Sequence, residues 1–220
     1  MLSSKQALDP DKRTWHPSPL PGQIVLLSTI NDKGQPNVAP KSWISMAAFE
    51  GPIVGFGCNI EHRTYQNIIA VDQYVINIPS ERLVKTIWSL LRHHGLERLK
   101  RCGLTLAPAE KVKAPIIVEC TAHLECKLVR IVKFGREVMI FGKIVAASID
   151  RDCVEASRAS RYSVLRPIFF LEDRTYGTIE SEKHVHKTLP KGEPESMAYR
   201  EKTKPHLSTN FLKRKHRKSP

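Results

Sequence analysis

The sequence predicts a mainly β fold with flanking helices. Apolar runs of strand length, separated by turn residues, recur from residue 23 to residue 171, whereas helical periodicity is confined to a few segments between them. With 220 residues and a hydrophobic content of 41%, the chain is long enough for one sizeable core but not for two full domains. We therefore expect an N-terminal arm over residues 1–20, one folded domain over 21–180 and a basic, flexible tail over 181–220.

Two strands are predicted in the first part of the domain. Residues 23–30 form an apolar run that ends in a turn, and residues 53–57 form a buried run that contains Gly55 and Gly57. Glycine inside a strand often marks a place where another molecule approaches the backbone, so we expect a flat ligand there. Between the two runs, residues 42–46 offer hydroxyl groups to a heterocycle, with Trp43 and Met46 beside it.

A helix is predicted over residues 65–71, and the residues before it form a candidate anion site. A helix N-terminus offers unpaired N–H groups and a positive dipole, and Arg63 adds a charged fork that suits a phosphate group. The alternative is an ordinary helix start, in which Thr64 is the N-cap and Arg63 is exposed to solvent. On these residues alone, the alternative is favoured.

A second helix is predicted over residues 80–94, because its apolar positions follow the helical period. Glu81 in its first turn agrees with the helix dipole, and Gly95 is a natural stop. The adjacent His93 and His94 cannot both face one metal ion from neighbouring helical positions. We interpret them as charge complementation at the helix end.

Residues 118–128 alternate between apolar and polar side chains, which predicts a strand with one wet face. Glu119 and Glu125 lie on this polar face together with His123 and Lys127. We interpret the two carboxylates as members of cross-strand charge pairs and not as an acid–base pair for catalysis.

Residues 138–149 are apolar at nearly every position, so this strand is predicted to be covered on both sides. One cover is the core of the domain, and we expect the other to be a second subunit. A short helix is predicted over 152–161, and a last strand is predicted over 166–171, before the turn at Tyr176.

The charge of the chain is concentrated at its C-terminal end. The formal net charge is +13, of which residues 181–220 carry +7, with 11 Lys and Arg against 4 Glu. A basic segment suggests an anionic partner, and nucleic acid is expected to bind only through this tail. Its Lys, Glu, Pro, Ser and His content cannot bury enough surface to fold alone.

Several classes of protein are excluded by the composition. The five cysteines form no CxxC pair and no zinc-type spacing with histidine, so neither zinc nor an iron–sulfur cluster is supported. Their odd number and the absence of a signal-like N-terminus favour a reducing cytoplasm. No apolar run approaches the roughly 20 residues of a membrane helix, and no third glycine completes a Rossmann fingerprint after Gly57.

The order and spacing of several short motifs resemble one family, the flavin reductase-like, FMN-binding split-barrel proteins, which include flavoredoxins and the reductase components of two-component monooxygenases. The motifs are NVAP at 37–40 followed by Ser42–Trp43, the Gly51–Pro52 turn, Arg63–Thr64 before a helix, YVINIP at 74–79, GLTL at 103–106 and the long strand at 119–132. The chain departs from the family pattern at Lys41, where many relatives carry an aromatic or apolar residue, and at residues 50–52.

The resemblance implies an FMN-binding split β-barrel, with FAD as the alternative flavin and NAD(P)H as the reductant. It also implies a homodimer, and a monooxygenase or another electron acceptor as partner. The implied flavin-binding residues are Lys41, Ser42, Trp43, Ile44, Ser45, Cys58, Asn59, His62, Arg63 and Thr64. Of these, Lys41, Ser42, Trp43 and Ser45 are expected at the ring, Asn59 along the ribityl chain, and His62, Arg63 and Thr64 at the phosphate.

Some of these residues have equally ordinary interpretations. Trp43 is as well explained by core filling as by a wall of the flavin site, because buried aromatic residues are common. Lys41 either stabilises negative charge on a reduced ring or is simply solvated, and an isolated His62 is usually a surface residue.

Two classes of function follow. The first is an NAD(P)H-dependent flavin reductase, in which hydride passes from nicotinamide to the flavin and on to an acceptor. No catalytic side chains are predicted for it, because the cofactor carries the reactive atoms. The second is a non-catalytic flavin or electron carrier, or a split-barrel scaffold whose tail binds polyanions.

Overall fold

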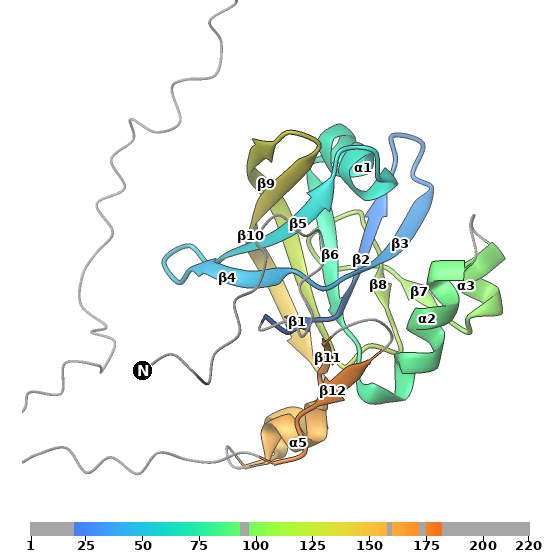
Figure 1. The fold of residues 1–220 in the computed structure, drawn as a ribbon, viewed down its shortest axis with the longest axis vertical. Helices are drawn as coiled ribbons and strands as arrows, with labels where there is room; N and C mark the ends of the chain where they lie inside the picture. Colours follow the sequence, from blue (N-terminus) through green and yellow to red (C-terminus); the bar gives the residue numbers. More distant parts are fainter. Residues whose placement is uncertain (1–19, 93–96, 158–159, 172–174, 182–220) are drawn as a thin grey trace, which may run out of the picture. The chain divides into compact units, whose positions relative to one another are not determined.

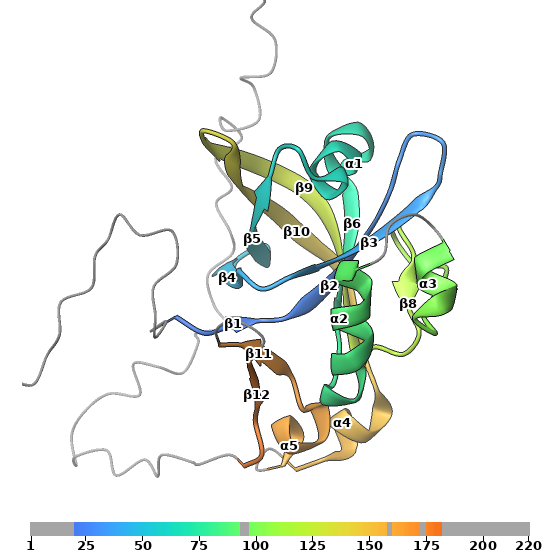
Figure 2. The same cartoon turned by 45° about the vertical axis from the view of Figure 1, so that its right-hand side comes forward.

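A seven-stranded antiparallel sheet, rolled into a barrel, forms the centre of the structure (Figures 1 and 2). The computed structural model describes residues 20–92, 97–157, 160–171 and 175–181. In order across the sheet, the strands are β3 (Pro36–Lys41), β2 (Val25–Ile30), β6 (Gln73–Ile78), β9 (Ala122–Phe134), β10 (Glu137–Ile149), β5 (Ile53–Asn59) and β4 (Ile44–Ala48).

The seam of the barrel lies where the two edge strands of this sheet follow one another in the sequence. Strand β3 ends at Lys41 and β4 begins at Ile44, so only Ser42 and Trp43 join the first strand of the sheet to the last. The Gly57 amide donates to the Trp43 carbonyl at 2.9 Å, which fastens this connection to β5. The seam is therefore formed by two residues that belong to neither β3 nor β4.

Helices and two small sheets flank the barrel. Helix α1 (Arg63–Val71) contacts β2, β3 and β5, and α2 (Val84–Arg92) contacts β3, as Figure 1 shows. The remaining elements are the 3₁₀ turn η1 (Glu81–Leu83), α3 (Glu97–Arg101), α4 (Arg151–Glu155), α5 (Arg161–Leu165), the sheet β1 (Gly22–Gln23), β11 (Ile168–Phe170) and β12 (Tyr176–Thr178), and the pair β7 (Leu106–Ala107) and β8 (Ile116–Ile117).

Two hydrophobic clusters lie on the two sides of β2, which is buried along its whole length. Val25 and Leu27 point into the barrel, where they pack with Phe56 and Tyr74, whereas Ile24 and Leu26 pack on the other side with α2. Both faces of the strand are thus buried, which is why its sequence shows no alternation. The predicted class, mainly β with flanking helices, is confirmed.

Several predicted boundaries differ from the structure. The helix predicted over 80–94 begins as the 3₁₀ turn η1, and the one predicted over 152–161 is two short helices, α4 and α5. The N-cap of α1 is His62, not Thr64, whose side chain is buried. Gly95, His93 and His94 lie outside the described residues, as do the arm before residue 20 and the tail after residue 181.

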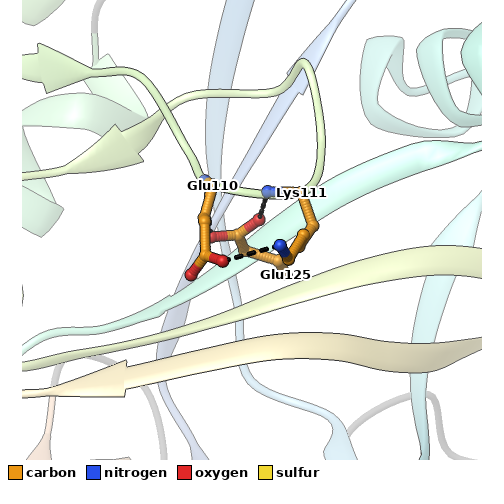
Figure 3. Close-up of polar contacts among 3 residues, drawn as sticks. All are labelled: Glu110, Lys111 and Glu125. Atoms are coloured by element: carbon orange, nitrogen blue, oxygen red, sulfur yellow. Dashed lines mark hydrogen bonds and ion pairs between the residues drawn. The ribbon is translucent and has the colours of Figure 1, made fainter.

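The predicted wet face of the strand at 118–128 is wrong. Strand β9 begins only at Ala122, and Thr121, His123 and Glu125 are all buried. The cause is a segment, residues 108–117, that crosses this face and that we call the strap. Glu125 accepts hydrogen bonds from the strap amides of Glu110 at 2.9 Å and Lys111 at 2.6 Å (Figure 3), so it caps a loop instead of pairing across the sheet.

Other side chains of the sheet hold the rest of the strap. Gln73 accepts the Lys113 amide at 2.8 Å, and the Ser28 hydroxyl donates to the Pro115 carbonyl. Asn77, which is fully buried, accepts the Ile117 amide at 2.9 Å. Polar side chains of the predicted wet face and of the strands beside it therefore bind the backbone of the strap, which pairs with another strand only at its end, where Ile116 and Ile117 form β8.

His123 belongs to the same buried network. Its Nδ1 lies 3.0 Å from Oδ1 of Asn77, which accepts a hydrogen bond there, so Nδ1 carries the proton of the neutral ring. Burial lowers the pKa of His123 below its ordinary value, although the carboxylates of Asp150 and Glu125 act in the opposite direction. The imidazole is therefore neutral in the folded protein at neutral pH.

We expect the stability of the fold to decrease as the pH falls below about 6.5, the ordinary pKa of histidine. Because the pKa of His123 is lower in the folded state than in the unfolded state, the unfolded chain binds more protons in this range, and acid favours unfolding. Melting temperatures between about pH 7.5 and 5.5 measure the effect. His123→Gln keeps a donor to Asn77 without the titration, and an unchanged pH dependence in this variant would contradict the assignment.

Within the described residues, no helix is long and apolar enough to cross a membrane. The same part of the chain holds no cluster of three or more His, Cys, Asp or Glu side chains suited to a metal ion. All five cysteines lie in it, and each is a free thiol.

Candidate functional site

Two adjoining hollows open beside the seam of the barrel. The larger has a volume of about 510 Å³ and lies between β3, the start of α1 and helices α2 and α3. The smaller, of about 190 Å³, lies between the seam and the end of β5. Pro40, Lys41 and His62 line both hollows, so the two hollows meet at these residues and form one continuous cleft. We call this meeting point the waist.

The small hollow contains most of the predicted ring-binding residues. Ser42 and Trp43 reach it from the seam, and Cys58 and Asn59 reach it from the end of β5. Trp43 is 69% exposed, so the interpretation of this residue as core filling is wrong. Its indole lies against Gly57, where a Cβ atom would come within 3.2 Å of the ring.

The two strand glycines make room for aromatic rings of the protein itself. A Cβ atom on Gly55 would come within 2.8 Å of Phe141 on β10, and the space over Gly57 is taken by Trp43. The flat groups that approach these two glycines are side chains of neighbouring elements, so the expectation of a ligand at the glycines stays a prediction. The outer surface of Trp43 remains available to a further flat group.

Lys41 and His62 form a polar contact at the waist. Nζ of Lys41 lies 2.9 Å from Nδ1 of His62, an arrangement in which the ammonium group donates to a neutral ring. Burial and then the charge of Lys41 lower the pKa of His62, which keeps the imidazole neutral. The Cys58 thiol lies 3.9 Å from the same nitrogen, and burial raises its pKa despite Lys41. Cys58 is therefore a protonated thiol and a poor nucleophile.

The large hollow contains the predicted phosphate-binding residues. His62, Arg63 and Thr64 line it where α1 begins, and the first amides of a helix have no partner within the helix. The Arg63 side chain is exposed and forms no ion pair within the described part of the chain. An exposed cation and the start of a helix thus face one end of the cleft.

Asn59 is held by a residue that the sequence did not indicate. Its Nδ2 donates to Glu137 at 2.7 Å, and its Oδ1 accepts the Glu61 amide at 2.9 Å. Glu137 is the first residue of β10 and stands opposite Asn59 in the strand register, so it also lines the small hollow. Glu137 could have been predicted as a site residue only from the pairing register of β5 and β10.

Two predicted residues do not reach the cleft. Ile44 packs against the barrel core, and the hydroxyl of Ser45 donates to the Met46 carbonyl at 3.2 Å; neither residue lines a hollow. The eight other residues assigned to the flavin line the cleft: Lys41, Ser42, Trp43, Cys58, Asn59, His62, Arg63 and Thr64.

Comparison with known proteins gives consistent matches. A family model described as flavin reductase like domain matches residues 18–177. The fold is similar to nitrilotriacetate monooxygenase component B from Bacillus cereus, with a TM-score of 0.74 and 19% identity over 83% of this chain and 99% of that one. It is also similar to flavoredoxin of Desulfovibrio vulgaris (Miyazaki F), with a TM-score of 0.70 and 21% identity over 86% and 100% of the two chains.

A third solved structure is somewhat closer in sequence. The 2-nitrobenzoate 2-nitroreductase of Pseudomonas fluorescens has 26% identity and a TM-score of 0.68, over 82% of this chain and 90% of that one. The predicted split β-barrel and the family resemblance stated from the sequence are both confirmed by these matches.

Proposed function

We propose, since the chain belongs to the flavin reductase-like family, that it is an NAD(P)H-dependent flavin reductase that binds FMN in the cleft at the barrel seam. Family membership places the chain among flavin-related oxidoreductases. The observation that carries the finer proposal is the waist at Lys41 and His62, which joins a hollow beside an exposed tryptophan to a hollow beside a helix start.

The small hollow fits the ring of a flavin in its chemistry. Trp43 offers a flat apolar surface, and Ser42 and Asn59 stand beside it with polar groups suited to the edge of a heterocycle. The hydrogen bond from Asn59 to Glu137 fixes the orientation of this amide. The hollow is thus apolar on one side and polar at its margin, as ligand sites commonly are.

The waist and the large hollow fit a phosphate group. Arg63 presents a guanidinium fork, Lys41 presents an ammonium group, and the helix start adds N–H donors and a partial positive charge. The imidazole of His62 accepts a hydrogen bond from the Lys41 ammonium group and so holds this group at the waist. These are the residues that would hold the phosphate of FMN.

A bound flavin supplies the hydride chemistry, accepting from nicotinamide and delivering to an acceptor. The protein's own contribution is binding, orientation and charge. Lys41 places a positive charge between the two ends of the cleft, which favours negative charge on a bound group. The protonated thiol of Cys58 adds no competing nucleophile.

We propose further that the protein is a homodimer that passes electrons to a monooxygenase or another acceptor. Support for the dimer comes from the outer face of β10, where Met139 and Phe141 are only half-buried by this chain. The free thiols at all five cysteines support a reducing compartment such as the cytoplasm.

The proposal predicts that the purified protein is yellow or becomes so with FMN, and that it oxidises NADH or NADPH when an acceptor is present. Absorption near the flavin bands, fluorescence quenching during FMN titration and steady-state NAD(P)H oxidation measure the three properties. A protein that binds FMN but oxidises neither nucleotide would be a carrier instead of a reductase. A protein that binds no flavin would overturn the proposal.

A further inference from the structure

Two opposite charges border the small hollow. Lys41 reaches it from the end of β3, and Glu137 reaches it from the start of β10. Glu137 is the only acidic residue among the described residues that line this hollow, and it is exposed to solvent. A group bound beside Trp43 would therefore lie in the field of one cation and one anion.

The Glu137 carboxylate is not neutralised by a neighbouring cation. Its hydrogen bond at 2.7 Å comes from the uncharged amide of Asn59, and it forms no ion pair within the described part of the chain. The adjacent Arg136 pairs with Glu61 instead, at 3.1 Å. Lys41 donates its hydrogen bond to an imidazole and not to this carboxylate. Both charges of the small hollow therefore remain able to act on a bound group.

Two side chains of the same hollow respond to both charges. Burial has the largest effect on the pKa of His62 and lowers it; Lys41 lowers this pKa further, whereas Glu137 raises it. Burial also has the largest effect on the pKa of Cys58 and raises it; Lys41 acts against burial, and Glu137 acts with it. Glu137 thus disfavours added negative charge in this hollow, and Lys41 favours it.

We propose that Glu137 weakens the binding of reduced flavin relative to oxidised flavin in the small hollow. This inference rests on the proposed function, which places the flavin ring beside Trp43. Reduction adds negative charge to the ring, and protein charges near the ring change the energy of that step. A carboxylate repels the added charge, whereas the uncharged oxidised ring is little affected. Glu137 is therefore a specificity-determining residue that discriminates between two states of one cofactor.

The expected consequence is a lower midpoint potential of bound FMN, because the ratio of the two affinities fixes the difference between the bound and the free potential. A lower potential makes the bound reduced flavin a stronger electron donor, and weaker binding favours its release to an acceptor. Both effects suit a protein that passes electrons on. Lys41 acts in the opposite direction, so the measured potential reflects the two charges together.

Glu137→Gln separates the charge of this residue from its hydrogen bond. The amide oxygen of glutamine still accepts from Nδ2 of Asn59, so the orientation of Asn59 is kept while the negative charge is removed. Glu137→Ala removes both. The matched control is Glu119→Gln, which removes a carboxylate that accepts the Thr105 amide and lines neither hollow. Melting temperatures establish that all three variants are folded.

The test uses the full chain, with fluorescence quenching for the Kd of oxidised FMN and spectroelectrochemical titration for the midpoint potential of bound FMN. We expect Glu137→Gln to leave the oxidised affinity unchanged within about twofold and to strengthen the binding of reduced FMN by about fivefold, as an exposed charge nearby would. For a two-electron couple this ratio corresponds to a rise of about 20 mV. The rise should shrink at high salt, and Glu119→Gln should show none.

Equal potentials in Glu137→Gln and the parent protein would overturn the inference. A shift in Glu137→Ala alone would also overturn it, because Glu137 would then act only by holding Asn59. A lower potential in Glu137→Gln has the wrong sign and would contradict it as well. In these three cases FMN is bound, and the proposed flavin site stands. A parent protein that binds no FMN would instead overturn the proposed function and this inference together.

Discussion

Replacing Glu125 by alanine is expected to destabilise the protein by about 2–4 kcal/mol, because two charge-assisted hydrogen bonds to the strap are lost. The carboxylate accepts the amides of Glu110 at 2.9 Å and Lys111 at 2.6 Å, and the side chain is buried beneath them (Figure 3). Denaturant unfolding of the variant and the parent protein measures the difference.

Glu119→Ala is the matched control. Glu119 also accepts a loop amide, that of Thr105 at 3.0 Å, but this bond is exposed to solvent. Water replaces an exposed acceptor at little cost, so we expect a loss below about 1 kcal/mol. The ion pair between Lys111 and Glu110, at 2.8 Å, is also exposed and contributes little. Equal losses for the two variants would show that Glu125 does not hold the strap.

The error at Glu125 shows which part of the fold the sequence could not predict. Alternation along 118–128 correctly indicated a strand, and Cys126 and Leu124 do face the barrel core. Alternation does not reveal what covers the polar side, because the cover comes from residues 108–117, which have no periodic pattern. Their position is determined by Ser28, Gln73 and Asn77 on strands that are distant in the sequence.

The residues of the candidate site likewise fall into those that the sequence could predict and those that depend on contacts between distant segments. Most residues that reach the cleft from a short continuous segment were assigned from the motifs of the sequence, namely Lys41 to Trp43, Cys58 and Asn59, and His62 to Thr64. Glu137 was missed because only the pairing of β10 with β5 brings it to Asn59. Leu91 lines the large hollow but was not predicted there, because the helical period marks it as one more apolar position and does not reveal that it is 61% exposed.

Arg63 is the residue whose loss should weaken FMN binding most. Arg63→Ala is expected to raise the dissociation constant by about tenfold to a hundredfold, since a hydrogen bond between charged groups contributes about 1.5–3 kcal/mol. Stability should be unchanged, because the side chain is exposed and forms no ion pair among the described residues. Fluorescence titration at low salt, together with a melting curve, measures both quantities.

Riboflavin, which lacks the phosphate, separates a phosphate contact from a general effect on the cleft. If Arg63 binds the phosphate, Arg63→Ala weakens FMN binding and leaves riboflavin binding unchanged, and the difference shrinks at high salt as the charges are screened. Arg63→Lys should give an intermediate affinity, because it keeps the charge but loses the planar fork. Arg130→Ala removes an exposed arginine of β9 that lines neither hollow, and it should match the parent protein. If FMN and riboflavin respond alike to Arg63→Ala, Arg63 does not bind the phosphate, and the exposed guanidinium is an ordinary feature of a helix start.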